Sequence, residues 1–143
     1  MLSLSLSLEY ILLYHLDNRQ LFYEHHSSRI SFDPNLMDAL RQAIQQGQIL
    51  LPQTTNRIQQ ELFQNHNLLL RTGKYTVCIA LFNSTPNRLM QDAVQSFHIR
   101  FESRWNTELA NLYTTLQGNL QVFYQDLPTR PNVQKLIDEV FHA

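Results

Sequence analysis

The side chains in this sequence that could do chemistry are scattered and do not form a known motif. There are six histidines and one cysteine, Cys78. His98 and Glu102 stand four residues apart, and on a helix this spacing puts both side chains on one face, where they could reach one metal ion. No second pair of ligands accompanies them, so a weak pair on a partly exposed helix face is the favoured interpretation. The sequence therefore predicts no metal site and no cofactor.

Nucleophilic catalysis is not indicated either. Cys78 lies among apolar residues and is predicted to be a small buried side chain, because a reactive thiolate needs an exposed, electropositive setting. The sequence has neither a Walker phosphate loop nor a Gly-x-Ser-x-Gly elbow, and Gly47, Gly73 and Gly118 are interpreted as single turn residues. Without a nucleophile and a base to activate it, we expect no catalytic residues and no enzyme activity.

Arginine offers one further kind of chemistry, the inserted finger that assists a GTPase. The candidates are Arg57, Arg88, Arg100 and Arg104. Nothing in the surrounding pattern distinguishes one of them, so solvated surface arginine is the favoured interpretation of all four.

Composition and charge exclude several classes of protein. With 143 residues, 43% of them apolar and 16% charged, the chain is typical of a single domain over 1–143. A formal net charge of −1 gives no basic excess for the phosphate backbone of nucleic acid and leaves only weak binding through a local patch. The opening residues lack the leading positive charge of a signal peptide and the roughly 20 continuous apolar residues of a membrane span. We therefore expect a cytoplasmic protein without a membrane span or a nucleic-acid partner.

Hydrophobic periodicity predicts the elements that must position these side chains. The alternation in LSLSLSLEY predicts a first strand, which LLYHLDNRQLFY continues into a hairpin. A first helix begins at Asp33 as N-cap and Pro34, and ends at Gly47. Three strands follow, in RIQQELF, LLLRTG and KYTVCIALF, joined by tight turns at 65–67 and 72–74.

Two more helices complete the prediction. A long helix begins at Pro86, capped by Ser84 or Thr85, and its apolar stripe comprises Leu89, Met90, Ala93, Val94, Phe97, Phe101 and Trp105. A last helix lies in TRPNVQKLIDEVFHA, and the segment 113–128 between them is irregular. The expected fold is α+β, a five-stranded antiparallel sheet with one helix on one face and two on the other, in the order β-β-α-β-β-β-α-α. One interface is expected to bury together Val77, Ile79, Leu81, Phe97 and Phe101.

The most polar strand, RIQQELF, is predicted to lie at an edge of the sheet. Ile58 and Leu62 alternate along it, only Arg57 and Glu61 are charged, and it has no proline or lysine, so little protects it from pairing with another strand. A two-fold homodimer would cover such an edge, and the alternative is that a different partner occupies it. The expected interface comprises Arg57, Ile58, Gln59, Gln60, Glu61 and Leu62, with Gln42, Gln45 and Gln46 of the first helix.

Three segments resemble the longin and roadblock group of profilin-like domains. LLYHLDNRQLFY resembles its opening hairpin, and FDPNLMDALRQAI its first helix, entered through Asp-Pro in many prokaryotic members. GKYTVCIALF, followed by a long helix and LIDEVF, resembles its last strand and C-terminal part. The likeness covers nearly the whole chain and points to a prokaryotic longin-like protein associated with small GTPases.

The resemblance implies interaction instead of catalysis. It implies a module that binds or regulates a small Ras-like GTPase, or a scaffold in a GTPase-linked assembly, and that dimerises through the first helix and an adjoining edge strand. The alternative is a small-molecule sensor of profilin-like architecture. A ligand pocket between sheet and long helix would favour the sensor, whereas a filled core with an exposed apolar edge would favour the interaction module.

Overall fold

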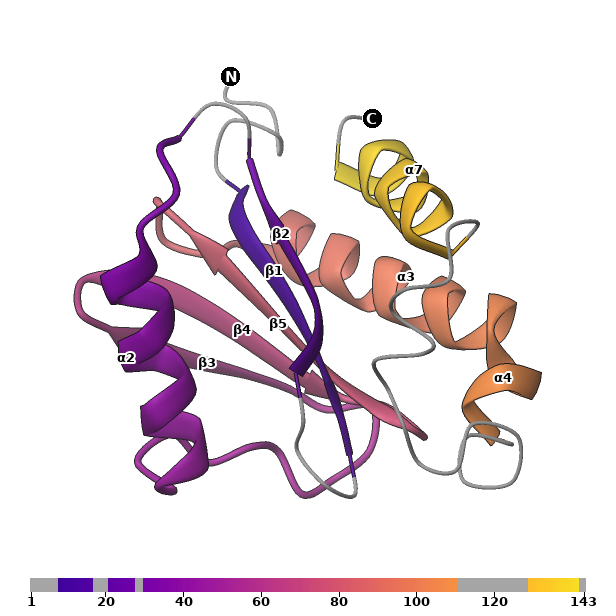
Figure 1. Ribbon diagram of the computed structural model, residues 1–143, viewed down its shortest axis with the longest axis horizontal. Coiled ribbons are helices and arrows are strands. Elements are labelled where there is room, and N and C mark those ends of the chain that lie inside the picture. Colours follow the sequence, from indigo (N-terminus) through magenta and orange to yellow (C-terminus); the bar gives the residue numbers. More distant parts are fainter. Residues whose placement is uncertain (1–7, 17–20, 28–29, 111–128, 142–143) are drawn as a thin grey trace.

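The computed structural model describes residues 8–16, 21–27, 30–110 and 129–141, and forms three layers (Figure 1). Helix α2 covers one face of a sheet, while α3 and α7 cover the other. In chain order the elements are β1 (Leu8–His15), β2 (Leu21–His26), α2 (Pro34–Gln45), β3 (Ile58–Phe63), β4 (His66–Thr72), β5 (Thr76–Phe82), α3 (Arg88–Arg104), α4 (Asn106–Ala110) and α7 (Thr129–Phe141).

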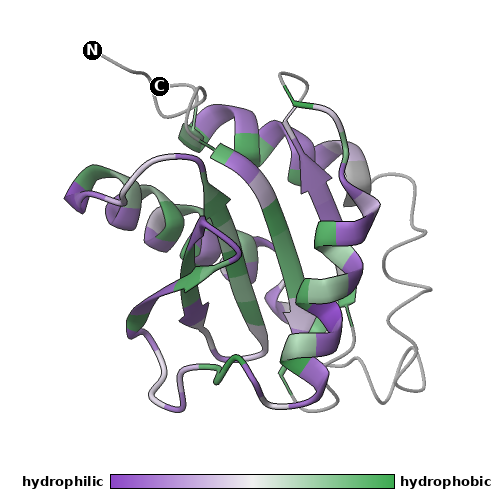
Figure 2. Cartoon of the chain, turned by 90° about the vertical axis from the view of Figure 1, so that its left-hand side faces the viewer, coloured by the Kyte–Doolittle hydropathy of each residue, from purple (hydrophilic) through white to green (hydrophobic). Residues whose placement is uncertain are grey.

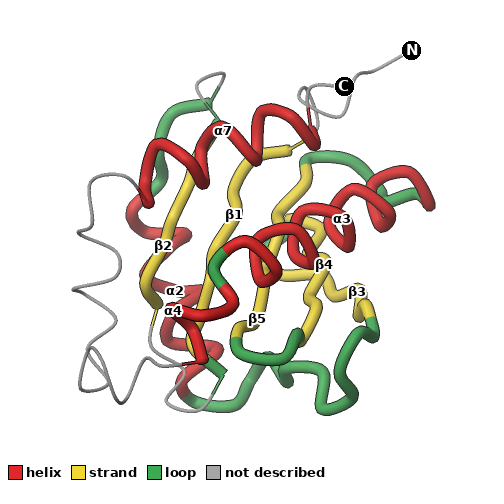
Figure 3. The backbone as a smooth tube through the Cα atoms, turned by 90° about the vertical axis from the view of Figure 1, so that its right-hand side faces the viewer, coloured by secondary structure: helices red, strands yellow, loops and turns green. Residues whose placement is uncertain are grey.

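The sheet has five antiparallel strands in the order β2-β1-β5-β4-β3, so β2 and β3 form its two edges (Figure 3). The predicted α+β class, strand number, element order and helix placement are confirmed, as is the edge position of β3. The short helix α4 is an addition, directly after α3. Among the described helices none is long and apolar enough to cross a membrane.

Both faces of the sheet bury apolar side chains, and the central strands contribute to both. Figure 2 shows that hydrophobic residues predominate along the strands in the middle of the sheet. An α3-side cluster includes Cys78, Ala80, Phe82, Phe97 and Phe101. An α2-side cluster includes Val77, Ile79, Leu81, Leu36 and Leu40. The prediction of one shared interface is therefore wrong: all its residues are buried, but the sheet separates them. A strand that is apolar on both faces carries no local signal for which helix covers which face.

The ends of α2 follow its sequence signals. The Asp33 carboxylate accepts a hydrogen bond from the Leu36 N–H at 3.1 Å, Pro34 opens the helix, and Gly47 takes φ +76° just beyond its end. In contrast, α3 begins at Arg88, later than predicted, because the side chain of Asn87 caps it instead. Leu89, expected in the buried stripe, is 61% exposed.

The β3–β4 hairpin closes through a two-residue turn of Gln64 and Asn65. Their φ angles are +48° and +67°, as a type I′ turn requires, and Phe63 pairs with His66 on either side. The turn predicted at 65–67 starts one residue late and ends two residues late, because His66 and Asn67 already belong to β4. The predictions for the first seven residues, the turn at 17–20 and the segment 113–128 lie outside the described residues.

Candidate functional site

The residues predicted for an interface lie on the β3 edge, except the three glutamines. Gln60, Glu61 and Leu62 are exposed, and Leu62 keeps 68% of its surface in contact with solvent. Ile58 is half-buried against the α3-side cluster. Arg57, just before the strand, is exposed and forms no ion pair with the described residues. Two hydrogen bonds fix the Gln59 side chain, which donates to the Leu50 carbonyl and to the Glu61 carboxylate.

The register of β3 decides which of its backbone groups are free. In a hairpin with a two-residue turn the flanking pair, Phe63 and His66, is hydrogen-bonded, and such pairs alternate along the ladder. The backbone N–H and C=O of Ile58, Gln60 and Leu62 therefore point away from β4. No described strand pairs with that side of β3. The edge thus offers three successive residues for pairing with an added strand.

The glutamines of α2 are exposed but do not all face β3. The side of the helix that faces β2 is marked by Arg41, which binds Glu24 of β2 at 2.5 Å. Gln45 follows Arg41 by four residues and shares that side. Gln46, the C-cap residue, is exposed just beyond the end of the helix. Gln45 is therefore turned toward β2 and away from a partner on the β3 edge.

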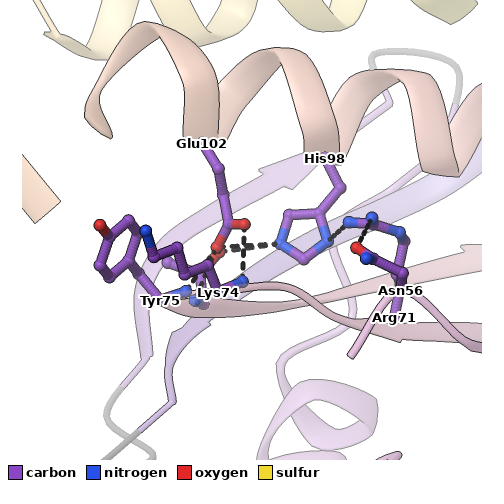
Figure 4. Close-up of polar contacts among 7 residues, drawn as sticks. Asn56, Arg71, Lys74, Tyr75, His98 and Glu102 are labelled. Atoms are coloured by element: carbon purple, nitrogen blue, oxygen red, sulfur yellow. Dashed lines mark hydrogen bonds and ion pairs between the residues drawn. The ribbon is translucent and has the colours of Figure 1, made fainter. Parts of the chain in front are cut away.

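A second constellation, missed in the sequence, lies where α3 crosses the β4–β5 turn (Figure 4). The carboxylate of Glu102 accepts hydrogen bonds from the backbone N–H of Lys74, Tyr75 and Thr76, at 2.9, 2.9 and 2.8 Å. The Thr76 hydroxyl donates to the same carboxylate at 2.8 Å. Four donors from one turn thus hold one side chain of the long helix.

His98, one helical turn before Glu102, continues this network into the core (Figure 4). Arg71 has no acceptor, so its Nη1–H must donate to His98 Nδ1, 2.8 Å away. The proton of the neutral imidazole then sits on Nε2 and donates to Thr76 Oγ1, also at 2.8 Å. The second arm of Arg71 donates to Asn56 at 2.5 Å. The network therefore joins the loop before β3, strand β4, the β4–β5 turn and α3.

Burial and charge set the protonation of this network. Burial lowers the pKa of His98 to about 4, and the Arg71 charge acts in the same direction against the opposing effect of Glu102. Burial acts to raise the pKa of Glu102, but His98 and the hydrogen bonds from the turn outweigh it, so this pKa lies below its ordinary value. At neutral pH the histidine is neutral and the glutamate charged.

The network contains a histidine, a hydroxyl and a carboxylate, but in the wrong order for nucleophilic catalysis. In a catalytic triad the acid binds the second ring nitrogen and stabilises the imidazolium. Here Arg71 occupies that nitrogen and opposes the imidazolium, while Glu102 binds the hydroxyl of Thr76. Thr76 and His98 are both fully buried. The network therefore links α3 to β4 and the β4–β5 turn by hydrogen bonds, and it does not activate the Thr76 hydroxyl as a nucleophile.

The expectation of a weak, partly exposed pair at His98 and Glu102 is wrong. His98 is fully buried and the Glu102 side chain is 12% exposed. No group of three or more possible metal ligands occurs within the described ranges. Cys78 is buried as predicted, and burial raises the pKa of its thiol to about 12, which leaves no reactive thiolate.

Two of the four arginines considered as fingers have partners. Arg100 pairs with Glu139 of α7, and Arg104 lies over the Trp105 ring. Arg57 is the arginine of the four that lies beside the exposed strand edge.

No family model matches this chain, and no curated protein matches it in sequence. A proposal of function therefore depends on the fold, the exposed β3 edge and the resemblance in sequence.

Proposed function

We propose that this chain is a non-catalytic protein-interaction module of longin or roadblock type that works in the cytoplasm. It binds or regulates a small Ras-like GTPase, or serves as a scaffold in a GTPase-linked assembly, and it forms a homodimer. The observation that carries the proposal is the exposed β3 edge, with outward backbone groups at Ile58, Gln60 and Leu62 and an apolar side chain, Leu62, left in solvent.

The β3 sequence suits pairing with a second copy. In an antiparallel pair centred on Gln60, Ile58 lies opposite the partner's Leu62, so apolar side chains meet on the α3 side of the extended sheet. Gln59 lies opposite the partner's Glu61, which keeps the two carboxylates from facing each other. The two Gln60 residues pair through their outward backbone groups. This register joins two sheets into one without opposing like charges.

The support for a GTPase as the second partner is the resemblance of the hairpin, first helix and C-terminal segments, together with the element order. Arg57 adds a cation at the start of the exposed edge, free of ion pairs with the described residues. It is placed to meet the acidic or phosphate groups of a protein that docks there.

The edge is tested by two leucines with similar exposure. Leu62 on β3 is 68% exposed and Leu50 in the loop before it is 70% exposed. Leu62→Lys puts a charge into the proposed interface and should convert dimer to monomer in light scattering at micromolar concentration. Leu50→Lys changes the surface charge equally and should leave the dimer intact. A native protein that is monomeric at high concentration would contradict the dimer.

Proline distinguishes backbone pairing from side-chain contact. Gln60→Pro removes an outward N–H without disturbing the β3–β4 hydrogen bonds, so the variant should be monomeric with an unchanged circular dichroism spectrum.

The GTPase partner is tested separately, by asking whether a Ras-like GTPase loaded with GDP or a GTP analogue is retained on the immobilised protein. GTP hydrolysis or exchange should require the added GTPase, and turnover by the purified chain alone would overturn the non-catalytic assignment.

One observation favours the sensor alternative. The Tyr14 hydroxyl and the Arg41 Nε are buried and have no hydrogen-bond partner within the described part of the chain. Both lie between α2 and the sheet, and the Arg41 and Glu24 charges both act on the Tyr14 pKa, which burial raises to about 12. A small ligand or a water could satisfy these two donors. A small molecule whose stabilising effect is lost in Tyr14→Phe would favour this alternative.

A further inference from the structure

The β4–β5 turn is built like a receptor for an oxyanion. Three consecutive backbone N–H groups, of Lys74, Tyr75 and Thr76, converge on one carboxylate at 2.8–2.9 Å, and the Thr76 hydroxyl joins them. Successive N–H groups that form a concavity for an anion are the feature by which phosphate-binding loops hold their ligand. Here the anion comes from the protein itself, because Glu102 reaches over from α3 (Figure 4).

The residues around the turn maintain this concavity. Gly73 leaves room for the anion, since a Cβ at this position would lie 2.2 Å from Glu102 Oε1. Lys74 is exposed, with its ammonium 5.3 Å from the centre of the Tyr75 ring, and it forms no ion pair with the described residues. Buried Arg71 interacts electrostatically with Glu102. Without Glu102, four donors and two cations would therefore remain with no anion.

We propose that Gly73–Thr76 is an oxyanion-binding site, that Glu102 is its tethered occupant, and that a phosphate or carboxylate group binds there when Glu102 is withdrawn. This assignment does not depend on the proposed GTPase partner. A tethered group acts at an effective concentration of about a millimolar or more, so free anions compete poorly in the native protein. An incoming anion would also meet the charge of Glu102. The native site is therefore closed, and removal of one carboxylate opens it.

The ligand is defined by the donors. N–H groups aimed at two oxygens of one carboxylate fit the oxygens of phosphate or of another carboxylate, and they fit a spherical chloride poorly. A free phosphate and an acidic side chain of a partner offer the same oxyanion chemistry. Inorganic phosphate and formate, used as separate probes, distinguish the two sources.

The test is chemical rescue of Glu102→Ala. Phosphate or formate, titrated against chloride at equal ionic strength, should raise the thermal midpoint saturably, by about 3–6 °C at ten times the dissociation constant. The backbone amide resonances of Lys74, Tyr75 and Thr76 should shift along the same titration. Rescue by phosphate alone identifies a phosphate site, and rescue by both identifies a general oxyanion site that also takes carboxylates.

Two variants control the experiment. Glu139→Ala removes an exposed carboxylate that pairs with Arg100 elsewhere on α3, and should show no anion-specific rescue. If Glu102→Ala does not fold in chloride, phosphate or formate should restore its folded spectrum, and Glu102→Gln provides a closer fit to the native packing. Equal effects of all three anions in both Glu102 variants, or resonance shifts away from the turn, would overturn the proposal.

Discussion

Acid should destabilise this protein through His98. The imidazole is fully buried, with Arg71 donating to its Nδ1 and Thr76 accepting from its Nε2. Protonation at Nδ1 would replace the Arg71 hydrogen bond by two cations in contact. The folded protein therefore holds His98 neutral, whereas the unfolded chain allows it to be protonated at mildly acidic pH.

The sign and size of the effect follow from the two pKa values. His98 has a pKa of about 4 in the folded protein against 6.5 for the free side chain. Between these values only the unfolded chain binds the proton, so stability is fully present above pH 6.5 and is lost as the pH falls toward 4. The lost free energy of unfolding is about 3 kcal/mol. Glu102, whose pKa is lowered, contributes in the same direction at still lower pH.

The assay is urea unfolding, followed by circular dichroism, at pH 7, 6, 5 and 4. His98→Gln keeps an acceptor for Arg71 and a donor for Thr76 but cannot titrate, so its stability should fall less steeply over this range than that of the native protein. His26→Gln, at an exposed position on β2, should keep the native slope. Parallel pH profiles for the native protein and His98→Gln would refute the assignment of a neutral, arginine-bound histidine.

Three further substitutions test the packing. Gly73→Ala forces a Cβ against the Glu102 carboxylate and should cost about 2–4 kcal/mol in urea unfolding, since charged hydrogen bonds are broken. Asn56 accepts a hydrogen bond from Arg71 and has φ +71°, so Asn56→Ala loses the contact, strains the backbone and should lower the free energy of unfolding by about 2–3 kcal/mol. Asn56→Asp keeps an acceptor and tolerates the same backbone, so it should lower the free energy of unfolding by less than about 1 kcal/mol. Phe97→Ala, at a fully buried position beside Phe101, should cost about 3–5 kcal/mol, and a loss below about 1 kcal/mol would contradict its burial.

Local signals were sufficient for most of the fold. Asp33, Pro34 and Gly47 define α2 because capping and turn preferences act over a few residues. The polar composition of RIQQELF marks it as an edge, because helices cover a strand at the rim of a sheet less completely than an interior strand. Each of these conclusions needs only the residues within one element.

The polar network was not predictable in the same way. The spacing of His98 and Glu102 showed that they share a helix face, but not that this face meets a turn 26–28 residues earlier in the chain. Single residues such as Gly73 carry no signal for a partner that arrives from another element. The start of α3 was misplaced because Ser84, Asn87 and Thr85 are all good caps, and only packing chooses among them.

The strand order has a consequence for synthesis on the ribosome. β1 lies between β2 and β5, and its longer pairing is with β5, where Leu12 lies beside Ile79. The N-terminal hairpin is synthesised first, and at typical elongation rates β5 follows it on the order of several seconds later. During that interval one edge of β1 and its α3-side face lack their native cover, because α2 is translated before β5 whereas α3 and α7 follow it. Nascent chains of this protein should therefore engage holding chaperones before the β3–β4–β5 meander, whose contacts are local, gives the hairpin a place to dock.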